Sequence, residues 1–247
     1  MRRVAFAILV LLMTLTTSAA VKVIAIKHVA AGGGGGNLLS ETFDGATGGY
    51  DNTWTESGTG TIDQDETAAC GTGTGWATEC LEFNLTGSQT GASTSAFASQ
   101  TGDVWVRFRA KITYDLSASS DSEGFVLAAI NSSASSLTAG GTALAIYKFG
   151  GGTPTYEISL RSGNTEKSFT TAPASGETHC YEFWRNSTDD SWEWWIDGAS
   201  QGSASSGGAF SAGTNLWLQG APVPASSTAT LYFDDVQVSN EARQTCP

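Results

Sequence analysis

The sequence predicts an all-β protein, an antiparallel two-sheet β-sandwich. Short runs in which apolar and polar residues alternate recur along the chain, which is typical of strands with one buried face. Gly, Ser and Thr separate these runs, with 30 glycines among the 247 residues. After residue 36 no long stretch shows the apolar period of a helix, and a sandwich of this length is commonly one domain.

The first residues predict a secretory signal peptide, Met1–Ala20. Arg2 and Arg3 form its charged start, Val4–Leu15 its apolar stretch and Ser18–Ala20 the small residues of a cleavage site. The apolar stretch is shorter than the roughly 20 residues that cross a membrane, and a retained signal anchor is the alternative. We therefore expect a secreted or extracellular protein with no membrane span after signal cleavage.

A tethered strand is expected next, in residues 21–36. Val21–Ala31 is apolar and Gly32–Gly36 is a flexible linker, so the folded domain should span residues 37–247. An apolar strand on such a tether could pair with the sheet edge of a neighbouring copy, as in donor-strand assemblies. Self-association through this strand is thus one prediction; the alternatives are that it folds back onto its own sandwich or stays disordered.

Alternating runs bounded by turn residues predict strands throughout the domain. The absence of helices between them argues against a parallel sheet. The expected strands are Asn37–Phe43, Cys80–Leu85, Asp103–Tyr114, Gly124–Ile130, Thr142–Phe149, Thr155–Arg161, Asn215–Gln219 and Ala229–Ser239, together with a hairpin at Tyr181–Gly198.

The hairpin Tyr181–Gly198 is the strongest local signal. It holds four of the eight tryptophans, in two alternating runs on either side of a polar turn. Alternation places Trp192 and Trp194 on the core face. It leaves Trp184 and Trp195 on the opposite face, where burial in the core does not explain them.

Four cysteines in an exported chain predict two disulfides. Of the three possible pairings we favour Cys70–Cys80, which closes a glycine-rich loop, and Cys180–Cys246, which ties the hairpin to the last residues of the sequence. A metal site is the weaker alternative, because no C-x-x-C spacing occurs and the sequence has only two histidines.

A polar outer face is predicted beside the hairpin. The apolar positions of Asp103–Tyr114 point to the core, so the positions between them point outward, together with polar positions of neighbouring runs. Four of the eight Lys and Arg residues that follow the glycine linker belong to this set. The predicted face bears Trp105, Arg107, Arg109, Lys111, Arg161, Glu182, Trp184, Glu193 and Trp195. All of them except Glu182 are candidate ligand-binding residues.

This combination of side chains predicts a saccharide-binding face. Sugar rings pack their C–H faces on flat aromatic rings, while charged side chains bind hydroxyl groups. Arginine also binds carboxylates bidentately, so acidic polysaccharides are a candidate ligand class. The alternative is that cross-strand Arg–Glu pairs only stabilise the sheet. The net charge of −12 argues against a nucleic-acid partner, since such binding depends on neutralising phosphates.

Three short motifs occur in order along the domain: Glu41–Gly45 (ETFDG), Trp195–Gly198 (WIDG) and Leu231–Val238 (LYFDDVQV). Together they resemble the concanavalin A-like lectin and glucanase superfamily, which includes LamG-type modules, legume lectins and laminarinase-type glycoside hydrolases. The first and last motifs also resemble other carbohydrate-binding jelly rolls, and the central hairpin favours the concanavalin A-like family. The resemblance covers Asn37–Ser239 and implies a jelly-roll fold.

The same resemblance implies a structural calcium ion, because in that superfamily such an ion often bridges the opening and closing strands. The matching positions are Glu41, Asp44 and Asp234, with Asp235 as an alternate, and carboxylate oxygens suit this cation. The alternative is that acidic residues beside glycine form turns.

A polysaccharide-cleaving enzyme is the main functional alternative. Retaining glycosidases need two carboxylates about 5–5.5 Å apart, and the E-x-D-x-x-E string of laminarinase-type enzymes is absent. Glu182 and Glu193, which could face each other across the hairpin, are the weak catalytic candidates. We therefore expect a non-catalytic, lectin-like carbohydrate-binding module. The alternatives are a glycosidase or lyase, and a subunit of an extracellular filament or coat built by donor-strand pairing.

Overall fold

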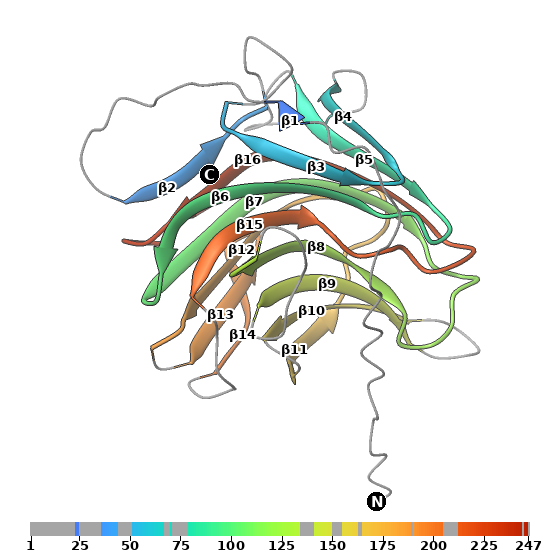
Figure 1. Ribbon diagram of the computed structural model, residues 1–247. Helices are drawn as coiled ribbons and strands as arrows, with labels where there is room; N and C mark the ends of the chain where they lie inside the picture. The colour runs from blue at the N-terminus through green and yellow to red at the C-terminus, as the bar shows by residue number, and fades with distance from the viewer. Residues whose placement is uncertain are drawn as a thin grey trace, which may run out of the picture.

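The computed structural model is an all-β structure made of two antiparallel sheets, which confirms the predicted β-sandwich (Figure 1). The structure describes residues 23–24, 36–43, 51–66, 70, 79–133, 141–149, 155–162, 165–188, 190–204, 212–243 and 245–246. The two curved sheets lie one behind the other in Figure 1, and we call them sheet A and sheet B.

Each sheet combines strands from both halves of the sequence. Sheet A has the order β1 (Val23–Ile24), β3 (Trp54–Gly58), β6 (Gly91–Gln100), β15 (Gly213–Gln219), β8 (Gly124–Asn131), β9 (Thr142–Phe149), β10 (Thr155–Ser162) and β11 (Thr165–Thr171). Sheet B has the order β14 (Ala199–Ala204), β13 (Ser191–Ile196), β12 (Thr178–Asn186), β7 (Asp103–Asp115), β16 (Thr228–Ser239), β5 (Cys80–Thr86) and β4 (Thr61–Glu66), while β2 (Asn37–Glu41) pairs with β16. Neighbours in a sheet are therefore mostly distant in sequence, and a shared face cannot be read from one segment.

The strands expected from alternation are all present, with small shifts at their ends. The strands that alternation did not predict are β3, β4, β6, β11 and β14. The sequence of β6, GASTSAFASQ, explains why. Its Ser93 and Ser95 are buried although they are polar, because neighbouring strands enclose them, so its sequence carries no apolar period.

Alternation correctly identified the core face of the central strands. On β7 the residues Val104, Phe108 and Ala110 are fully buried, and on β13 Trp192 and Trp194 are 2% and 0% exposed. These two tryptophans are therefore core residues, as predicted. Large aromatic side chains fill the space between the sheets, which is how a sandwich gains most of its stability.

The short strand β1 pairs with the edge of its own sandwich. Val23 lies opposite Thr55 and Ile24 opposite Trp54 of β3. This is the fold-back arrangement that was one alternative for the tethered strand, and self-association stays a prediction. The predicted signal peptide lies outside the described residues.

Both predicted disulfides are confirmed. Cys70 is bonded to Cys80, and Cys180 of β12 is bonded to Cys246. No free cysteine occurs among the described residues. Searched over the same residues, the structure contains no helix that is long and apolar enough to cross a membrane.

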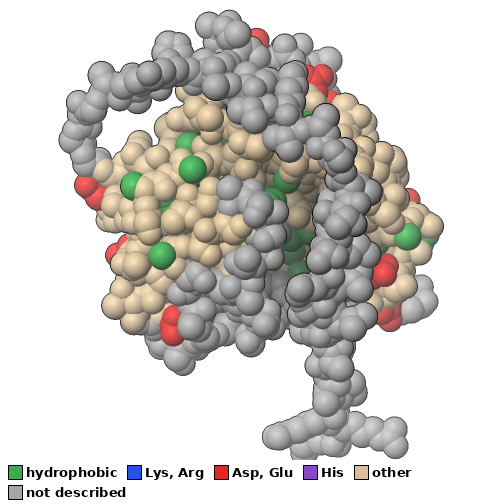
Figure 2. All heavy atoms as spheres, in the orientation of Figure 1, with side chains coloured by type: hydrophobic (Ala, Val, Ile, Leu, Met, Phe, Trp, Pro, Cys, Tyr) green, Lys and Arg blue, Asp and Glu red, His purple; other side chains and the backbone are tan. Residues whose placement is uncertain are grey.

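Charged side chains are distributed differently over the described parts of the two sheets. Figure 2 shows hydrophobic and uncharged side chains across the side on which sheet A lies, with carboxylates near its margin and no Lys or Arg visible among the described residues. In sheet B, by contrast, Arg107, Arg109 and Lys111 follow one another along the outer face of β7. Among the described side chains, the row of cations on β7 therefore makes the outer face of sheet B the first place to look for a site with positive side chains.

Candidate functional site

Three tryptophan rings stack on the outer face of sheet B. Trp105 of β7 lies directly opposite Trp184 of β12 in the strand register, and Trp195 lies on β13. The Trp105 ring stacks with Trp184 at a centroid distance of 5.5 Å and with Trp195 at 5.9 Å. Trp105 and Trp184 are partly exposed, whereas Trp195 is only 5% exposed. The three rings that were expected to share a face therefore lie together, with one end of the stack open to solvent.

Polar neighbours fix the orientation of Trp184. Its Nε1 donates a hydrogen bond of 3.0 Å to Asp103 Oδ1, and the same oxygen accepts 2.8 Å from Asn186 Nδ2. Glu193 lies opposite Trp184 on β13, and its Oε1 accepts a hydrogen bond of 2.9 Å from Ser200. Because both of these acceptors are carboxylates, the open end of the stack is bordered by negative charge.

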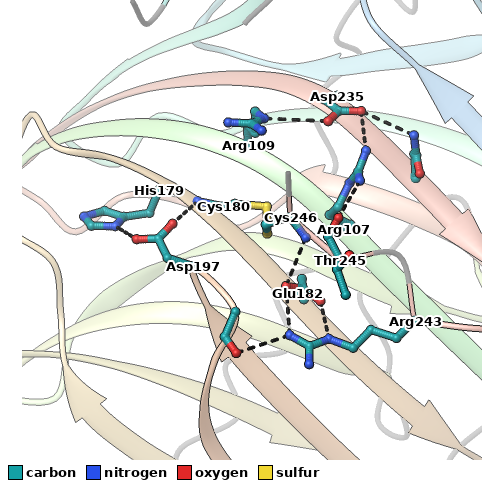
Figure 3. Close-up of a disulfide and its surroundings, with 12 residues drawn as sticks. Arg107, Arg109, His179, Cys180, Glu182, Asp197, Asp235, Arg243, Thr245 and Cys246 are labelled. Carbon is teal, nitrogen blue, oxygen red and sulfur yellow. Dashed lines mark hydrogen bonds and ion pairs between the residues drawn. A yellow bond between two sulfur atoms is a disulfide. The ribbon is translucent and has the colours of Figure 1, made fainter. Parts of the chain in front are cut away.

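Residues close to the last cysteine lie at the other end of the stack: Arg243 and Cys246 contact Glu182, and Thr245 contacts Arg107 (Figure 3). Arg243 donates from Nε and Nη2 to the two oxygens of Glu182, at 2.5 and 3.0 Å. Its guanidinium carbon also lies 4.1 Å from the centre of the Trp195 ring, within the range of a cation–π contact. Glu182 is consequently 1% exposed, and this half of the predicted face is closed.

The predicted arginines are buried in ion pairs. Arg107 Nη2 lies 2.6 Å from Asp235 Oδ1, and Arg109 Nε lies 3.6 Å from Asp235 Oδ2. The two arginines are 9% and 8% exposed. Lys111, further along β7, is partly exposed, with its Nζ 5.3 Å from the centre of the Tyr232 ring. Of the three predicted cations on β7, only Lys111 therefore offers appreciable surface to a ligand.

Arg161 does not belong to this face, which corrects the sequence prediction. It lies on β10, and β10 is a strand of sheet A, between β9 and β11. Its side chain lies outside the described part of the structure. The alternation within a strand assigns side chains to a face but does not say to which sheet the strand belongs, and this is why the assignment failed.

The expected pairing of Glu182 with Glu193 is also corrected. In the register of the hairpin, Glu182 lies opposite Trp195 and Glu193 lies opposite Trp184. The two carboxylates are therefore diagonal neighbours. Since both oxygens of Glu182 accept hydrogen bonds from Arg243, this residue does not resemble a free catalytic acid.

Glu41, a predicted calcium ligand, is buried and surrounded by N–H donors. Its Oε1 accepts from the backbone N–H groups of Phe43 and Asp51, and its Oε2 accepts from the backbone and side chain of Asn52 and, at 2.7 Å, from the indole of Trp54. Burial raises the pKa of Glu41 above 4.5, although these hydrogen bonds oppose the shift. Because N–H donors occupy both oxygens, Glu41 does not fit the role of a calcium ligand.

The other two predicted calcium ligands leave that prediction open. Asp44 lies outside the described residues. Asp234 is buried, and its Oδ1 accepts a hydrogen bond of 2.7 Å from the Asp235 N–H. In the part of the chain that the structure describes, no group of three or more His, Cys, Asp and Glu side chains is arranged to hold a metal ion.

Sequence reasoning did not single out Asp103 and Arg243, and it considered Asp235 only as an alternate calcium ligand; these three residues complete the arrangement on sheet B. A signal for Arg243 was present, because a Cys180–Cys246 disulfide brings the residues just before Cys246 over β12. The pairing of Asp235 with the arginines of β7 has no comparable signal, because it depends on β16 lying beside β7.

Comparisons with known proteins identify structural relatives only. No family model matches the sequence, and no curated protein matches it. Solved structures of similar fold include one from a study of botulinum neurotoxin type C cell entry and two ganglioside molecules (TM-score 0.56, 10% identity, 85% of this chain and 49% of that chain). Others are the botulinum neurotoxin serotype C1 binding domain (0.56, 9%, 85% and 50%) and the binding domain of neurotoxin DC in complex with SialylT (0.53, 8%, 84% and 48%).

These identities are low enough that the likeness concerns the fold alone. The chain spans about half the length of the structures it matches. What the architecture and the outer face of sheet B define is a β-sandwich with an aromatic stack, one end of which is open and the other closed.

Proposed function

We propose that this protein is a secreted, non-catalytic carbohydrate-binding module whose ligand stacks on Trp184 and the adjoining edge of Trp105. The observation that carries the proposal is the partly exposed indole stack on sheet B. An aromatic ring held in one orientation costs little conformational entropy when a ligand stacks on it.

The surroundings of Trp184 suit a sugar ring. A saccharide presents a C–H face that packs on the indole, while its hydroxyl groups at the ring margin donate to nearby acceptors. Asp103 and Glu193 supply carboxylate oxygens on either side of Trp184. This is the combination of an apolar surface and a few fixed polar groups that small-molecule sites use.

The structural relatives support a glycan ligand. Cell entry of botulinum neurotoxin type C depends on interaction with two ganglioside molecules, and the binding domain of neurotoxin DC forms a complex with SialylT. These relatives make glycans the first ligand class to test. Because they are only about 10% identical and this chain covers about half of their length, they do not indicate where the site lies, and its position is inferred from the residues of this chain.

The charges around the stack favour uncharged saccharides over acidic ones. Asp103 and Glu193 border Trp184 and would repel a uronic acid or a sulfate, while Arg107 and Arg109 are occupied by Asp235. Acidic polysaccharides, the class suggested by those arginines, are therefore the second class to test, with Lys111 as their cation.

The test is a glycan array probed with the wild-type protein, Trp184→Ala and Phe169→Ala. Phe169 of β11 is a matched control, because it is also an exposed aromatic side chain (38%) but lies on sheet A. Replacing Trp184 by alanine should weaken glycan binding about tenfold, which is the scale of one lost aromatic stacking contact. Phe169→Ala should bind like the wild type.

Binding that Trp184→Ala leaves unchanged would refute this site, and an empty array for the wild type would refute the function. Hydrolysis or elimination products released from a bound polysaccharide would favour the enzyme alternative instead.

Structural calcium is a separate proposal, with Asp44 and Asp234 as its ligands, since the N–H donors around Glu41 disfavour that residue as a ligand. Thermal unfolding with calcium and with EDTA tests it. A bound ion stabilises the folded state by mass action, so chelation should lower Tm, and the same Tm in both conditions would argue against the ion.

A further inference from the structure

Arg243, in the segment Glu241–Cys246, lies over the Trp195 end of the stack. Arg243 lies on the face of Trp195, forms a two-pronged ion pair with Glu182 and donates to the Gly198 carbonyl at 3.4 Å. An aromatic face, a carboxylate and a carbonyl together constitute a binding site for a planar polar group. We call this segment the strap; its residue 244 lies outside the described part of the chain.

Two further contacts seat the strap on the sheet. Arg107 Nη1 donates 3.0 Å to the carbonyl of Thr245, and the Cys246 N–H lies 3.4 Å from Glu182 Oε1. Figure 3 shows Arg243 and Cys246 in contact with Glu182 of β12, and Thr245 in contact with Arg107 of β7. The strap therefore covers Trp195 and Glu182 but leaves Trp184, at the other end of the stack, partly exposed.

The disulfide Cys180–Cys246 fastens the strap. Its β12 end is rigid, since Cys180 is 4% exposed and its N–H donates 2.8 Å to Asp197 Oδ1. Its strap end is more accessible, because Cys246 is partly exposed. Besides the disulfide, the strap is held by the ion pair and cation–π contact of the partly exposed Arg243 and by two hydrogen bonds, one from Arg107 and one from the Cys246 N–H. Water competes with the exposed ones among these polar contacts.

We propose that the strap is a disulfide-fastened cover over a second saccharide subsite, formed by Trp195 and Glu182 at the far end of the stack from Trp184. This rests on the proposed glycan function for the identity of the ligand, but not for the opening of the strap. With the disulfide formed, Arg243 occupies the subsite. With the disulfide reduced, the strap leaves, and a sugar ring can stack on Trp195 while Glu182 accepts its hydroxyl groups.

Reduction by a dithiol provides the opening step. One thiolate attacks the sulfur of Cys246 and forms a mixed disulfide, and Cys180 leaves as a thiolate that takes up a proton. The second thiol of the reductant then displaces Cys246 and becomes part of a cyclic disulfide. Two electrons and two protons pass to the protein, which ends with two thiols.

Opening is measured by acrylamide quenching of tryptophan fluorescence in two matched variants of the full chain. Cys180→Ser/Cys246→Ser removes the fastening, while Cys70→Ser/Cys80→Ser removes the other disulfide and leaves the strap fastened. The first variant should show increased quenching, and Trp195→Phe in its background should abolish the increase. The second should match the wild type, and circular dichroism verifies that both are folded.

A further variant keeps the test decisive if loss of the disulfide unfolds the protein. Arg243→Ala retains the disulfide but exposes the face of Trp195, so it should also increase quenching, whereas Arg243→Lys should do so less. If neither Cys180→Ser/Cys246→Ser nor Arg243→Ala changes the accessibility of Trp195, the strap is not a cover and the proposal is wrong.

Ligand binding is then measured by calorimetry with the best array glycan and with a single-ring fragment of it. The opened variant should bind the longer glycan several-fold to about tenfold more tightly, because a second aromatic ring is available. The fragment should bind both forms equally, since Trp184 is accessible in each. Equal affinity for the long glycan despite an opened strap would refute the second subsite. If neither form binds any glycan, the proposed function fails, and the second subsite fails with it, while quenching alone still decides whether the strap opens.

Discussion

At the scale of single residues, Glu41 illustrates how a buried carboxyl group is accommodated in an apolar fold. The group accepts N–H donors on both oxygens, whereas the amide of glutamine offers one acceptor and turns two donors toward those same N–H groups. We predict that Glu41→Gln lowers the free energy of unfolding by about 1–3 kcal/mol. Urea unfolding measures it, with Glu123→Gln, at an exposed position, as the control that should change little.

The pH dependence of this loss has a definite sign. Burial raises the folded-state pKa of Glu41 above 4.5, so the folded protein holds this proton more tightly than the unfolded chain does. The stability contributed by the proton is fully present below pH 4.5 and is lost as the pH rises through the folded-state pKa. The difference between wild type and Glu41→Gln should therefore be larger in acid than at neutral pH, and a larger difference at neutral pH would contradict the assignment.

Tyr114 provides the corresponding case at alkaline pH. Its hydroxyl donates 2.9 Å to the Pro173 carbonyl, and burial raises its pKa from 10.0 to about 12. We predict that Tyr114→Phe costs about 1 kcal/mol below pH 10, where the hydrogen bond is intact. The stability due to this phenol is lost as the pH rises through about 12, so the two proteins should converge there. Unfolding free energies measured across this range would contradict the prediction if the difference grew.

At the scale of elements, the turn between β13 and β14 depends on backbone conformation. Asp197 and Gly198 have φ values of +48° and +78°, as in the two-residue hairpin turns that favour Asp-Gly. A side chain at Gly198 would meet no atom within 4 Å, so Gly198→Ala tests conformational strain alone. We predict a loss of about 1 kcal/mol in unfolding free energy.

Gly102→Ala is the control for that substitution. Its added methyl group also meets nothing within 4 Å, and its φ is not positive. The variant should match or slightly exceed the wild type in stability. Equal effects of the two substitutions would mean that the turn tolerates a side chain and that strain is not what selects glycine.

The strands of sheet B show how far the sequence predicted the site. Period-two alternation correctly oriented β7, β12 and β13, because their core side chains are large and apolar, and it put Trp105, Trp184 and Trp195 on one face. It could not place Arg161, whose sheet depends on long-range strand order. Nor could it predict that Arg243 covers Trp195, since this contact joins residues that are distant in sequence and depends on the strap lying along β12.

At the scale of the whole molecule, the two disulfides constrain very different lengths of chain. Cys180–Cys246 spans 66 residues and Cys70–Cys80 spans 10. In the chain-entropy model, loss of the longer loop costs about 4 kcal/mol and loss of the shorter about 3 kcal/mol. If our proposal for the strap holds, Cys180→Ser/Cys246→Ser also frees the strap and exposes the ion pair of Arg243 with Glu182 to solvent, whereas Cys70→Ser/Cys80→Ser does not. We therefore predict that the first variant has the lower Tm and the lower midpoint in urea.

The lower stability expected for Cys180→Ser/Cys246→Ser has two possible causes, loop entropy and lost strap contacts, and the same measurements distinguish them. If loop entropy dominates, adding Arg243→Ala to Cys180→Ser/Cys246→Ser should change its stability little, because a freed strap has already lost its ordered contacts. If the strap stays in place through its polar contacts, the added substitution should cost about 1 kcal/mol or more, since Glu182 would lose its partner while still buried. If Cys180→Ser/Cys246→Ser is as stable as Cys70→Ser/Cys80→Ser, the contacts of the strap do not add to the stability of the fold. The strap would then be a cover without a structural role.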